Sequence, residues 1–419
     1  MFDFVVKPRQ VVQTEEVKPQ EERKVELYDY EPTDLERQII RMVEKTHPQL
    51  SPMLLWNLCV VFARYGNINL AIRGCGKSAV LKCIMNHVTK DDQLINNLKQ
   101  NPDEARKYIP IHIWVDAGFT PMYVADTMIP DPITGQLIPL YQAYERYPVQ
   151  HEVDDFCTFL VSARETMLHT FMFLSTVTYN KCYYGRVRGH PTIRQSDVGT
   201  IGSGTYEFGK EAMGLGLWTG NVQDRFIRYY HFYLNFPRIE DLPLIEENPP
   251  KIPDIYYKPL PDMPDSTSIE MFKMVRNMFA KQMTEARAEI VARRMLTAHA
   301  FINNKSMIDD DDCKFLLLFR PFIEIESSFV QRVTVEAEGI AQSRGLAFND
   351  IAPEILFYVC YKPVTMDEIA ERTNYKKEVI RRTLTKLARA GFVTENDGTW
   401  ECSGNFRRML EHVYRCLGK

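Results

Sequence analysis

The 419-residue sequence lacks the marks of several large classes of protein. Its nine cysteines include no CxxC pair, which argues against a zinc ribbon and is typical of reduced thiols inside a cell. No apolar run is long enough to cross a bilayer. The first ten residues, MFDFVVKPRQ, do not contain the apolar core of a signal peptide. We therefore expect an intracellular protein that makes no membrane contact.

The sequence also lacks a strong excess of either charge. Its net charge is -4 and its pI is about 6.2, so any surface for a nucleic acid must be local. Apolar residues make up 45% of the chain and charged residues 25%, which is the balance of an ordinary globular protein. A chain of this length can form two or three domains, each with its own core.

Changes of composition along the chain predict five segments. A strand–helix alternation followed by a helical block predicts an α/β unit and then an all-α unit. Charged and Gln-rich sequence at the start predicts a solvated, flexible arm, and a Pro-rich stretch predicts a semi-rigid spacer. The segments are an arm at 1–31, an α/β core at 32–236, a linker at 237–265, a helical lid at 266–345 and a C-terminal domain at 346–419.

Periodicity and cap residues predict the elements within these segments. Helices are expected over 33–46, 52–65, 78–88 and 136–147, and throughout 266–344. Short apolar runs predict buried strands over 67–72, 109–115, 121–125, 169–176 and 229–236. The many Gly, Ser and Thr residues of 189–220 predict a mobile insertion.

A glycine-containing loop stands between the first predicted strand and the helix that follows it. Its residues are Gly74, Cys75, Gly76, Lys77 and Ser78. Glycines let backbone N–H groups approach phosphate oxygens, and the positive end of the new helix faces them. In such a loop the lysine reaches the β- and γ-phosphates, and the serine hydroxyl binds Mg²⁺. A plain glycine turn would also suit these residues. The usual GxxxxGK[ST] pattern has glycine where this chain has Ala71, so we expect a shortened or distorted loop.

An ATPase with such a loop also needs an Asp at the end of a buried strand to hold Mg²⁺ through water, usually with a Glu beside it. Two residues qualify, since Asp116 ends the run IHIWVD and Asp126 ends the run MYVAD. Neither is followed by Glu, and a turn at the end of a strand would also explain either Asp. Glu145 or Glu152 could take the place of the missing Glu.

The order of these features resembles the AAA+ ATPases, specifically the branch of the MoxR-type ATPases and the minichromosome-maintenance helicases. The stretch ADTMIPDPITGQLIPLYQAYER at 125–146 is similar to the MoxR-type segment that carries the metal-binding Asp. This similarity selects Asp126 over Asp116 and places Thr127 where the family has its catalytic Glu. The resemblance covers about residues 50–330 and implies an α/β P-loop NTPase core with an all-α lid.

Three further motifs carry the resemblance. The run FMFLSTVTYNKCYYGR resembles the sensor 1 strand, which implies that Asn180, or as a second choice Thr178, orients the attacking water. The run NVQDRF is similar to the DRF or SRF box, which implies that Arg225 is an arginine finger for a neighbouring subunit. The run ARAEIVARRMLTAHAFINNKSMIDDDD resembles the helicase lid, which implies a sensor 2 role for Arg287 and matches Arg294 to the second lid arginine.

The C-terminal domain has the pattern of a winged helix-turn-helix. Thr365 caps a short helix, a basic second helix follows, and Asp397-Gly398 marks the tip of a hairpin. Residues 351–419 contain 12 Lys and Arg against 9 Asp and Glu, and the positive charge lies mainly on the second helix. This face would bind DNA phosphates from the major groove, although winged helices also make protein contacts. The predicted DNA-binding residues are Lys376, Lys377, Arg381, Arg382 and Lys386.

Together these features predict an ATP-dependent protein that acts on DNA as a helicase or loader, with ATP and Mg²⁺ as its ligands. ATP would lie between subunits of a homo-oligomer, for which a ring is one arrangement. We expect it in the cytoplasm or at the nucleoid, with a protein partner for the N-terminal arm. Two alternatives stay open. Thr127 favours a nucleotide-binding scaffold on DNA that hydrolyses poorly, and the MoxR-like segment favours a chaperone that remodels proteins.

Overall fold

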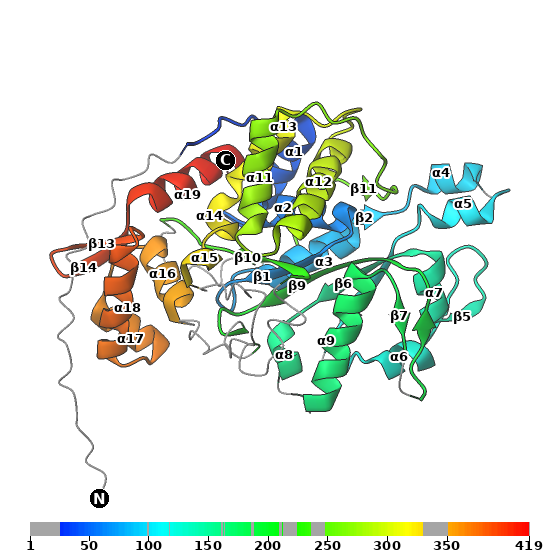
Figure 1. Ribbon diagram of the computed structural model, residues 1–419, viewed down its shortest axis with the longest axis horizontal. Helices are drawn as coiled ribbons and strands as arrows, with labels where there is room; N and C mark the ends of the chain where they lie inside the picture. Colours follow the sequence, from blue (N-terminus) through cyan, green and yellow to red (C-terminus); the bar gives the residue numbers. More distant parts are fainter. Residues whose placement is uncertain are drawn as a thin grey trace, which may run out of the picture.

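The computed structural model describes residues 26–98, 100–116, 118–160, 162, 164–185, 188–208, 212, 224–235, 248–329 and 351–418. Its centre is a five-stranded parallel sheet of order β10-β1-β9-β6-β3. The strands are β1 (Gly66–Leu70), β3 (Ile111–Val115), β6 (Pro148–Val153), β9 (Asp197–Gly204) and β10 (Phe226–Tyr230). Helices α2 (Ser51–Ala63) and α3 (Lys77–His87) lie on one face and α9 (Arg164–Tyr179) on the other (Figure 1). The predicted α/β core is therefore present.

The two faces of the central strand β1 make different contacts. Asn67 and Asn69 are fully buried and form side-chain hydrogen bonds with Asn57 of α2 at 3.0–3.2 Å and with each other at 2.9 Å. Alternate residues point the other way, so Ile68 and Leu70 enter the apolar core. Paired amides satisfy their hydrogen-bonding groups without water, which fixes the register between α2 and the sheet.

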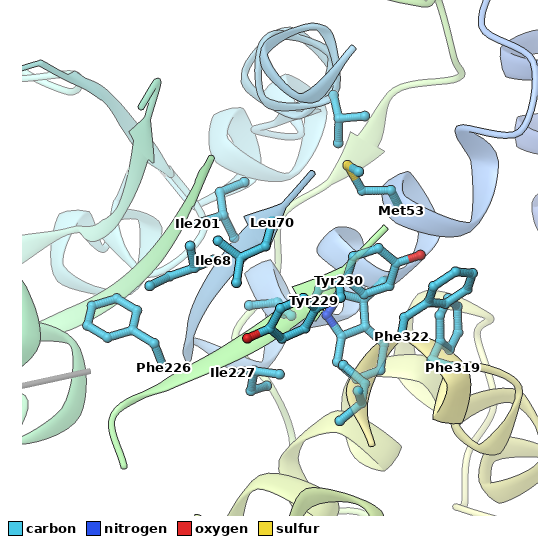
Figure 2. Close-up of a cluster of buried hydrophobic side chains, with 14 of the residues drawn as sticks. Met53, Ile68, Leu70, Ile201, Phe226, Ile227, Tyr229, Tyr230, Phe319 and Phe322 are labelled. Carbon is cyan, nitrogen blue, oxygen red and sulfur yellow. The ribbon is translucent and has the colours of Figure 1, made fainter. Parts of the chain in front are cut away.

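The helical block packs against the β10 side of the sheet. It consists of α11 (Ile269–Ala280), α12 (Glu285–Ile302), α13 (Asp310–Leu318), α14 (Arg320–Ile323) and α15 (Glu326–Phe329), joined by the N-terminal α1 (Asp34–Glu44). Figure 2 shows Tyr229 of β10 beside Phe319 and Phe322, with ring centroids 6.3 and 5.0 Å away. The buried Arg228 of β10 also pairs with Glu326 at 2.5 Å. The helical expectation for 266–344 is confirmed up to residue 329, and the rest lies outside the described residues.

The C-terminal module, which we define as residues 351–418, has its own small core. It contains α16 (Ile351–Tyr361), β12 (Val364–Thr365), α17 (Met366–Thr373), α18 (Lys377–Arg389), β13 (Val393–Asn396), β14 (Thr399–Cys402) and α19 (Gly404–Leu417). Its strands form an antiparallel sheet of order β12-β14-β13. The predicted capping box of Thr365 with Glu368 is confirmed, as is the hairpin turn, where Asp397 and Gly398 both have positive φ.

The module docks on the body through α19. The Tyr414 hydroxyl donates to the carbonyl of Phe232, just after β10, and the Ser51 hydroxyl of α2 donates to the carbonyl of Leu417. His412 bonds the carbonyl of Tyr28 at 2.8 Å. Figure 1 shows α19 lying over the helical block and α16 next to the end of the central sheet.

Short helices and three pairs of short strands make up the rest of the structure around the sheet. They are α4 (Asp92–Asn97), α5 (Pro102–Arg106), α6 (Pro121–Asp126), α7 (Leu140–Arg146), α8 (Phe156–Leu160) and the strand pairs β2 (Val88–Thr89) with β11 (Ile255–Tyr256), β4 (Met128–Pro130) with β5 (Leu137–Pro139), and β7 (Tyr183–Tyr184) with β8 (Thr192–Ile193). Within the part of the chain that the structure describes, no helix is both long and apolar enough to span a membrane.

Two of the predicted strands are helices. Residues 121–125 lie in α6, where Thr120 caps the first turn by accepting from the N–H of Tyr123 at 3.2 Å and Pro121 occupies the first turn. Residues 169–176 lie inside the sixteen-residue α9. A short apolar run is compatible with either a buried strand or a buried helix, so periodicity could not separate them.

The expected mobile insertion at 189–220 contains the central strand β9 instead. Its glycines serve packing, because a Cβ at Gly202 would overlap the Phe156 ring and one at Gly199 would overlap the Gln150 amide. Residues 209–211 and 213–220 of that segment lie outside the described residues, as do 237–247 of the predicted linker. The remaining linker residues run to β11, which pairs with β2.

Candidate nucleotide-binding site

The loop between β1 and α3 has an open inner surface. Gly74 and Gly76 have φ values of +75° and +81°, which side-chain-bearing residues rarely adopt. Among the described residues, apart from Gly74 itself and its two chain neighbours, no atom lies within 4 Å of the position that a Cβ on Gly74 would take. Helix α3 begins at Lys77, so its first N–H groups face the loop with their partial positive charge. These features fit the cradle that a phosphate group needs.

Lys77 lies inside the curve of this loop. Its ammonium donates to the carbonyls of Ala71 at 3.0 Å and Ile72 at 2.6 Å, and the residue is only 9% exposed. Ser78 follows in the first turn of α3 and is partly buried. Lys77 and Ser78 thus stand next to each other at the start of the helix that follows the glycines.

Ala71, where the usual pattern has glycine, continues the strand that leads into the loop. Ala71 has no positive φ, so its backbone does not require glycine. Its N–H donates to the carbonyl of Gly204 at 3.2 Å and extends the β1–β9 ladder by one residue. A buried methyl group therefore fits where the strand ends, and the shortened or distorted loop stays a prediction.

A pair of carboxylates stands at the same edge of the sheet. Asp154 and Asp155 directly follow β6, which is separated from β1 only by β9. Parallel strands bring their carboxyl ends to one edge, so this pair and the loop share it. Asp155 accepts from the N–H of Cys157 at 2.9 Å, and the Cys157 thiol lies 3.3 Å from the Thr205 hydroxyl at the end of β9.

Neither Asp154 nor strand β6 was predicted from the sequence. The strand reads PVQHEV, in which polar residues interrupt the apolar run. All six residues are buried, and the polar ones are partnered: His151 bonds Tyr144 at 2.6 Å, and Glu152 bonds His112 at 2.6 Å. An available signal was the pair of acids after a six-residue run with valines near both ends.

Neither predicted metal-binding Asp has the expected position. Asp126 is the last residue of α6 and does not end a strand, so the structural premise of that prediction is wrong. Asp116 does follow a strand, but β3 is the outer strand, with β6 and β9 between it and β1. Asp116 accepts from the N–H of Gly118 at 2.9 Å, as a turn residue does.

Asn180 and Thr178, the two residues predicted to orient the attacking water, do not lie at the end of a strand. Asn180 directly follows α9, and Thr178 is buried within that helix, where its hydroxyl lies 2.6 Å from that of Thr200. The expectation of a strand here is wrong.

The two acids that could take the place of the missing Glu are differently placed. Glu145 is exposed on α7 and accepts from the N–H of Arg194 at 2.8 Å. Burial raises the pKa of Glu152, whose partner His112 opposes the shift. Thr127 caps the end of α6.

Arg225 and Arg287 lie at the opposite edge of the sheet from the glycine loop. Arg225 precedes β10 and donates to the Ser175 hydroxyl at 3.0 Å. Arg287 pairs with Asp224 at 3.1 Å and lies over the Tyr179 ring at 4.6 Å. Burial and the neighbouring charge of Arg287 lower the pKa of Arg225. The structure thus brings the two arginines together, but away from the loop of the same chain.

The basic residues of the C-terminal module share one exposed face. Ile380, Thr383, Leu384 and Leu387 form the buried side of α18. The five predicted DNA-binding residues, Lys376, Lys377, Arg381, Arg382 and Lys386, are all exposed. Lys377 forms an ion pair with Asp367 of α17 at 2.7 Å, which places a negative charge beside it.

No protein-family model and no curated protein match the sequence. Among solved structures, the chain is similar to a crystal structure described as a "putative ATPase" from Cytophaga hutchinsonii. The identity is 13%, the TM-score is 0.37, and the match covers 66% of this chain and 83% of that one. A similarity of this size does not decide the activity of this chain, so the functional argument rests on its own residues.

Proposed function

We propose that the chain binds and hydrolyses ATP at the loop of Gly74, Gly76, Lys77 and Ser78. The observation that carries the proposal is the position of this loop between a central parallel strand and the N-terminus of α3. Ligands of open α/β sheets bind at the carboxyl ends of the strands. Lys77 would meet the β- and γ-phosphates, and the glycine N–H groups would surround them.

Ser78 and Asp154 are the residues we expect to hold Mg²⁺. Magnesium in nucleotide sites takes one or two protein oxygens together with phosphate oxygens and water. Among the described residues no group of three or more His, Cys, Asp or Glu is arranged to hold a metal alone, which fits a metal that arrives with the nucleotide. Asp155, which follows Asp154, would orient the water that attacks the γ-phosphate.

Hydrolysis would need a second copy of the chain. Arg225 and Arg287 border the edge of the sheet opposite the phosphate loop, so one chain cannot bring them to its own nucleotide. A head-to-tail arrangement would place these arginines of one subunit on the nucleotide of the next. The loop between a central parallel strand and α3, together with the helical block that packs on the sheet, supports the AAA+ interpretation, in which neighbouring subunits supply such arginines.

DNA is the partner we propose for the C-terminal module. The helices α17 and α18 followed by the β13–β14 hairpin support the winged-helix interpretation. The exposed cations of α18 would bind phosphates, while the net charge of -4 keeps this surface local. The activity would be that of a helicase or loader related to the minichromosome-maintenance branch.

A second candidate is a nucleotide-binding scaffold with little turnover. The observation that favours it is that Asp155 stands where a Glu is usual and already accepts the Cys157 N–H. Steady-state ATP turnover of the full chain, with and without duplex DNA, separates the candidates. The motor predicts turnover that rises with DNA. Tight ATP binding without turnover would support the scaffold, and turnover with no DNA affinity would support a protein-remodelling chaperone.

A further inference from the structure

A second pocket lies at the amino-terminal edge of the sheet, opposite the phosphate loop. Its volume is about 530 Å³, within the range of small-molecule sites. The walls come from Arg64 after α2, Lys181 after α9, Asp197 at the start of β9, Tyr257 after β11, and Arg293 and Arg294 of α12. Five elements that are distant in the sequence thus meet around one space.

Positive charge in this pocket exceeds the local negative charge. Arg64 lies 3.6 Å from Asp197, and Arg293 lies 3.5 Å from Asp265. Lys181 donates only to the carbonyls of Arg64 at 2.8 Å and Val198 at 2.6 Å. Across the described part of the chain, neither Lys181 nor Arg294 has a carboxylate within 4.0 Å. The lining thus holds four cations, Arg64, Lys181, Arg293 and Arg294, against three carboxylates, Asp197, Asp262 and Asp265. Among the described residues, Lys181 and Arg294 are the two cations of this lining that form no ion pair.

The positive charges of Lys181, Arg64 and Arg294 lie close enough to repel one another. Burial lowers the pKa of Lys181 to about 7, Asp197 opposes the shift, and the charges of Arg294 and Arg64 add to it. Nη2 of Arg64 is buried and has no hydrogen-bond partner among the described residues. The Arg64 guanidinium lies 4.2 Å from the centre of the Tyr257 ring, which in turn stacks on Phe62 at 5.6 Å. Stacking keeps Arg64 in place despite the repulsion.

We propose that this pocket binds a small phosphorylated molecule at a site separate from the phosphate loop. A phosphate would compensate the charges of Lys181 and Arg294 and could accept their N–H groups in charge-assisted hydrogen bonds. The Phe62–Tyr257 pair supplies a flat apolar wall for the rest of the ligand. The concave shape favours a small ligand over a long one that would lie across an open face.

The test measures binding of inorganic pyrophosphate by calorimetry to the full chain carrying Lys77→Ala, which weakens the phosphate loop. We expect binding that weakens at least about tenfold in Arg294→Gln, since a charge-assisted hydrogen bond is lost. The charge-reversing Arg294→Glu should weaken it further. Lys273→Met, on the exposed side of α11, is the matched control and should bind as the parent does. The thermal unfolding midpoint of each variant shows that it is folded.

Proton uptake gives a second readout. The bound anion should raise the pKa of Lys181, whose charged neighbours are Asp197 from β9, Arg64 from α2 and Arg294 from α12. Above about pH 7 binding should therefore take up a proton, and the measured heat should change with the ionisation enthalpy of the buffer. Absence of binding, or binding that Arg294→Glu leaves unchanged, would overturn the proposal.

Discussion

The hydroxyl of Tyr233 donates to the backbone carbonyl of Cys75 at 2.9 Å. Tyr233 follows β10 and is fully buried, and its ring lies 6.1 Å from Phe357 and 6.4 Å from Tyr361, both on α16. A single side chain thus joins the phosphate loop to the C-terminal module. The shape of the loop and the position of α16 cannot change independently at this contact.

Tyr233→Phe should weaken ATP binding by about twofold to tenfold, because a hydrogen bond that shapes the loop is worth roughly 1 kcal/mol. The ring and its packing against α16 are retained. Equilibrium titration with a fluorescent ATP analogue measures the change. Tyr206→Phe is the matched control, since it removes a buried hydroxyl that bonds the His231 carbonyl at 2.5 Å and not the loop. Equal effects of both substitutions on affinity would contradict the role of Tyr233.

Asp154→Asn should lower Mg²⁺-dependent ATP turnover by at least about a hundredfold, because the metal supplies several kcal/mol of charge stabilisation. The parallel substitution Asp126→Asn should leave turnover within about twofold, since Asp126 ends helix α6 away from the loop. Initial rates over a range of Mg²⁺ concentrations make the comparison. The opposite ranking of the two variants would restore Asp126 as the metal ligand.

Equal amounts of Lys77→Ala and Arg225→Ala chains should regain turnover that neither has alone. In a head-to-tail oligomer about a quarter of the interfaces would pair an intact Lys77 with an intact Arg225 from the other chain. The reason is that the two residues lie at opposite edges of one sheet. Steady-state rates of the separate and mixed variants test this. A mixture that is no more active than its components would show that the site does not form between subunits.

Stability should depend on pH through the buried His299. Its ring bonds Glu36 at 2.8 Å and Asp312 at 2.6 Å, joining α1, α12 and α13. Burial lowers the pKa of His299, but these hydrogen bonds and charges outweigh it and raise the pKa above its ordinary value. The stabilisation is full below the unfolded-state pKa of about 6.5 and is lost as the pH rises through the folded-state pKa.

The free energy of unfolding should therefore fall from about pH 6.5 upward, as urea denaturation would show. His299→Gln should cost about 3 to 5 kcal/mol near neutral pH, because it removes the cation between two buried carboxylates. Glu36 then loses its ion-pair partner, while Asp312 keeps Lys305 at 3.1 Å. This variant should also lose the decline above about pH 6.5. His87→Gln serves as a control, since His87 pairs with the exposed Asp254 at the surface. A decline that His299→Gln retains would contradict the assignment.

Local signals in the sequence predicted much of the fold. The Thr33 and Thr365 caps, the Asp397-Gly398 turn and the loop ending in Lys77 depend on residues within a few positions of one another, and the structure has all four. Each of these features can be predicted without knowing which distant residues it contacts.

Elements fixed by distant partners could not be predicted in the same way. Strand β6 contains polar residues and is nevertheless buried. Its Glu152 is paired with His112 of β3, some forty positions earlier in the sequence, and no local pattern reveals such a partner. The glycines of β9 suggested a mobile segment. Position 202 in fact requires glycine because the Phe156 ring packs against it. The acidic pair Asp154 and Asp155 depends on β6 for its position, so it could not be predicted without that strand. The choice of Asp126 depended on the similarity to the MoxR-type segment, which does not reveal that the residue ends a helix.

Turnover of ATP by the full chain and by its Lys77→Ala variant tests the central claim most directly. Lys82→Ala, on the same helix α3 but on its exposed side, is the matched control. We predict Mg²⁺-dependent turnover in the parent and in Lys82→Ala, and a loss of at least about a hundredfold in Lys77→Ala, since the transition-state charge would lack its lysine. Turnover that Lys77→Ala leaves unchanged would contradict the assignment of the nucleotide to this loop.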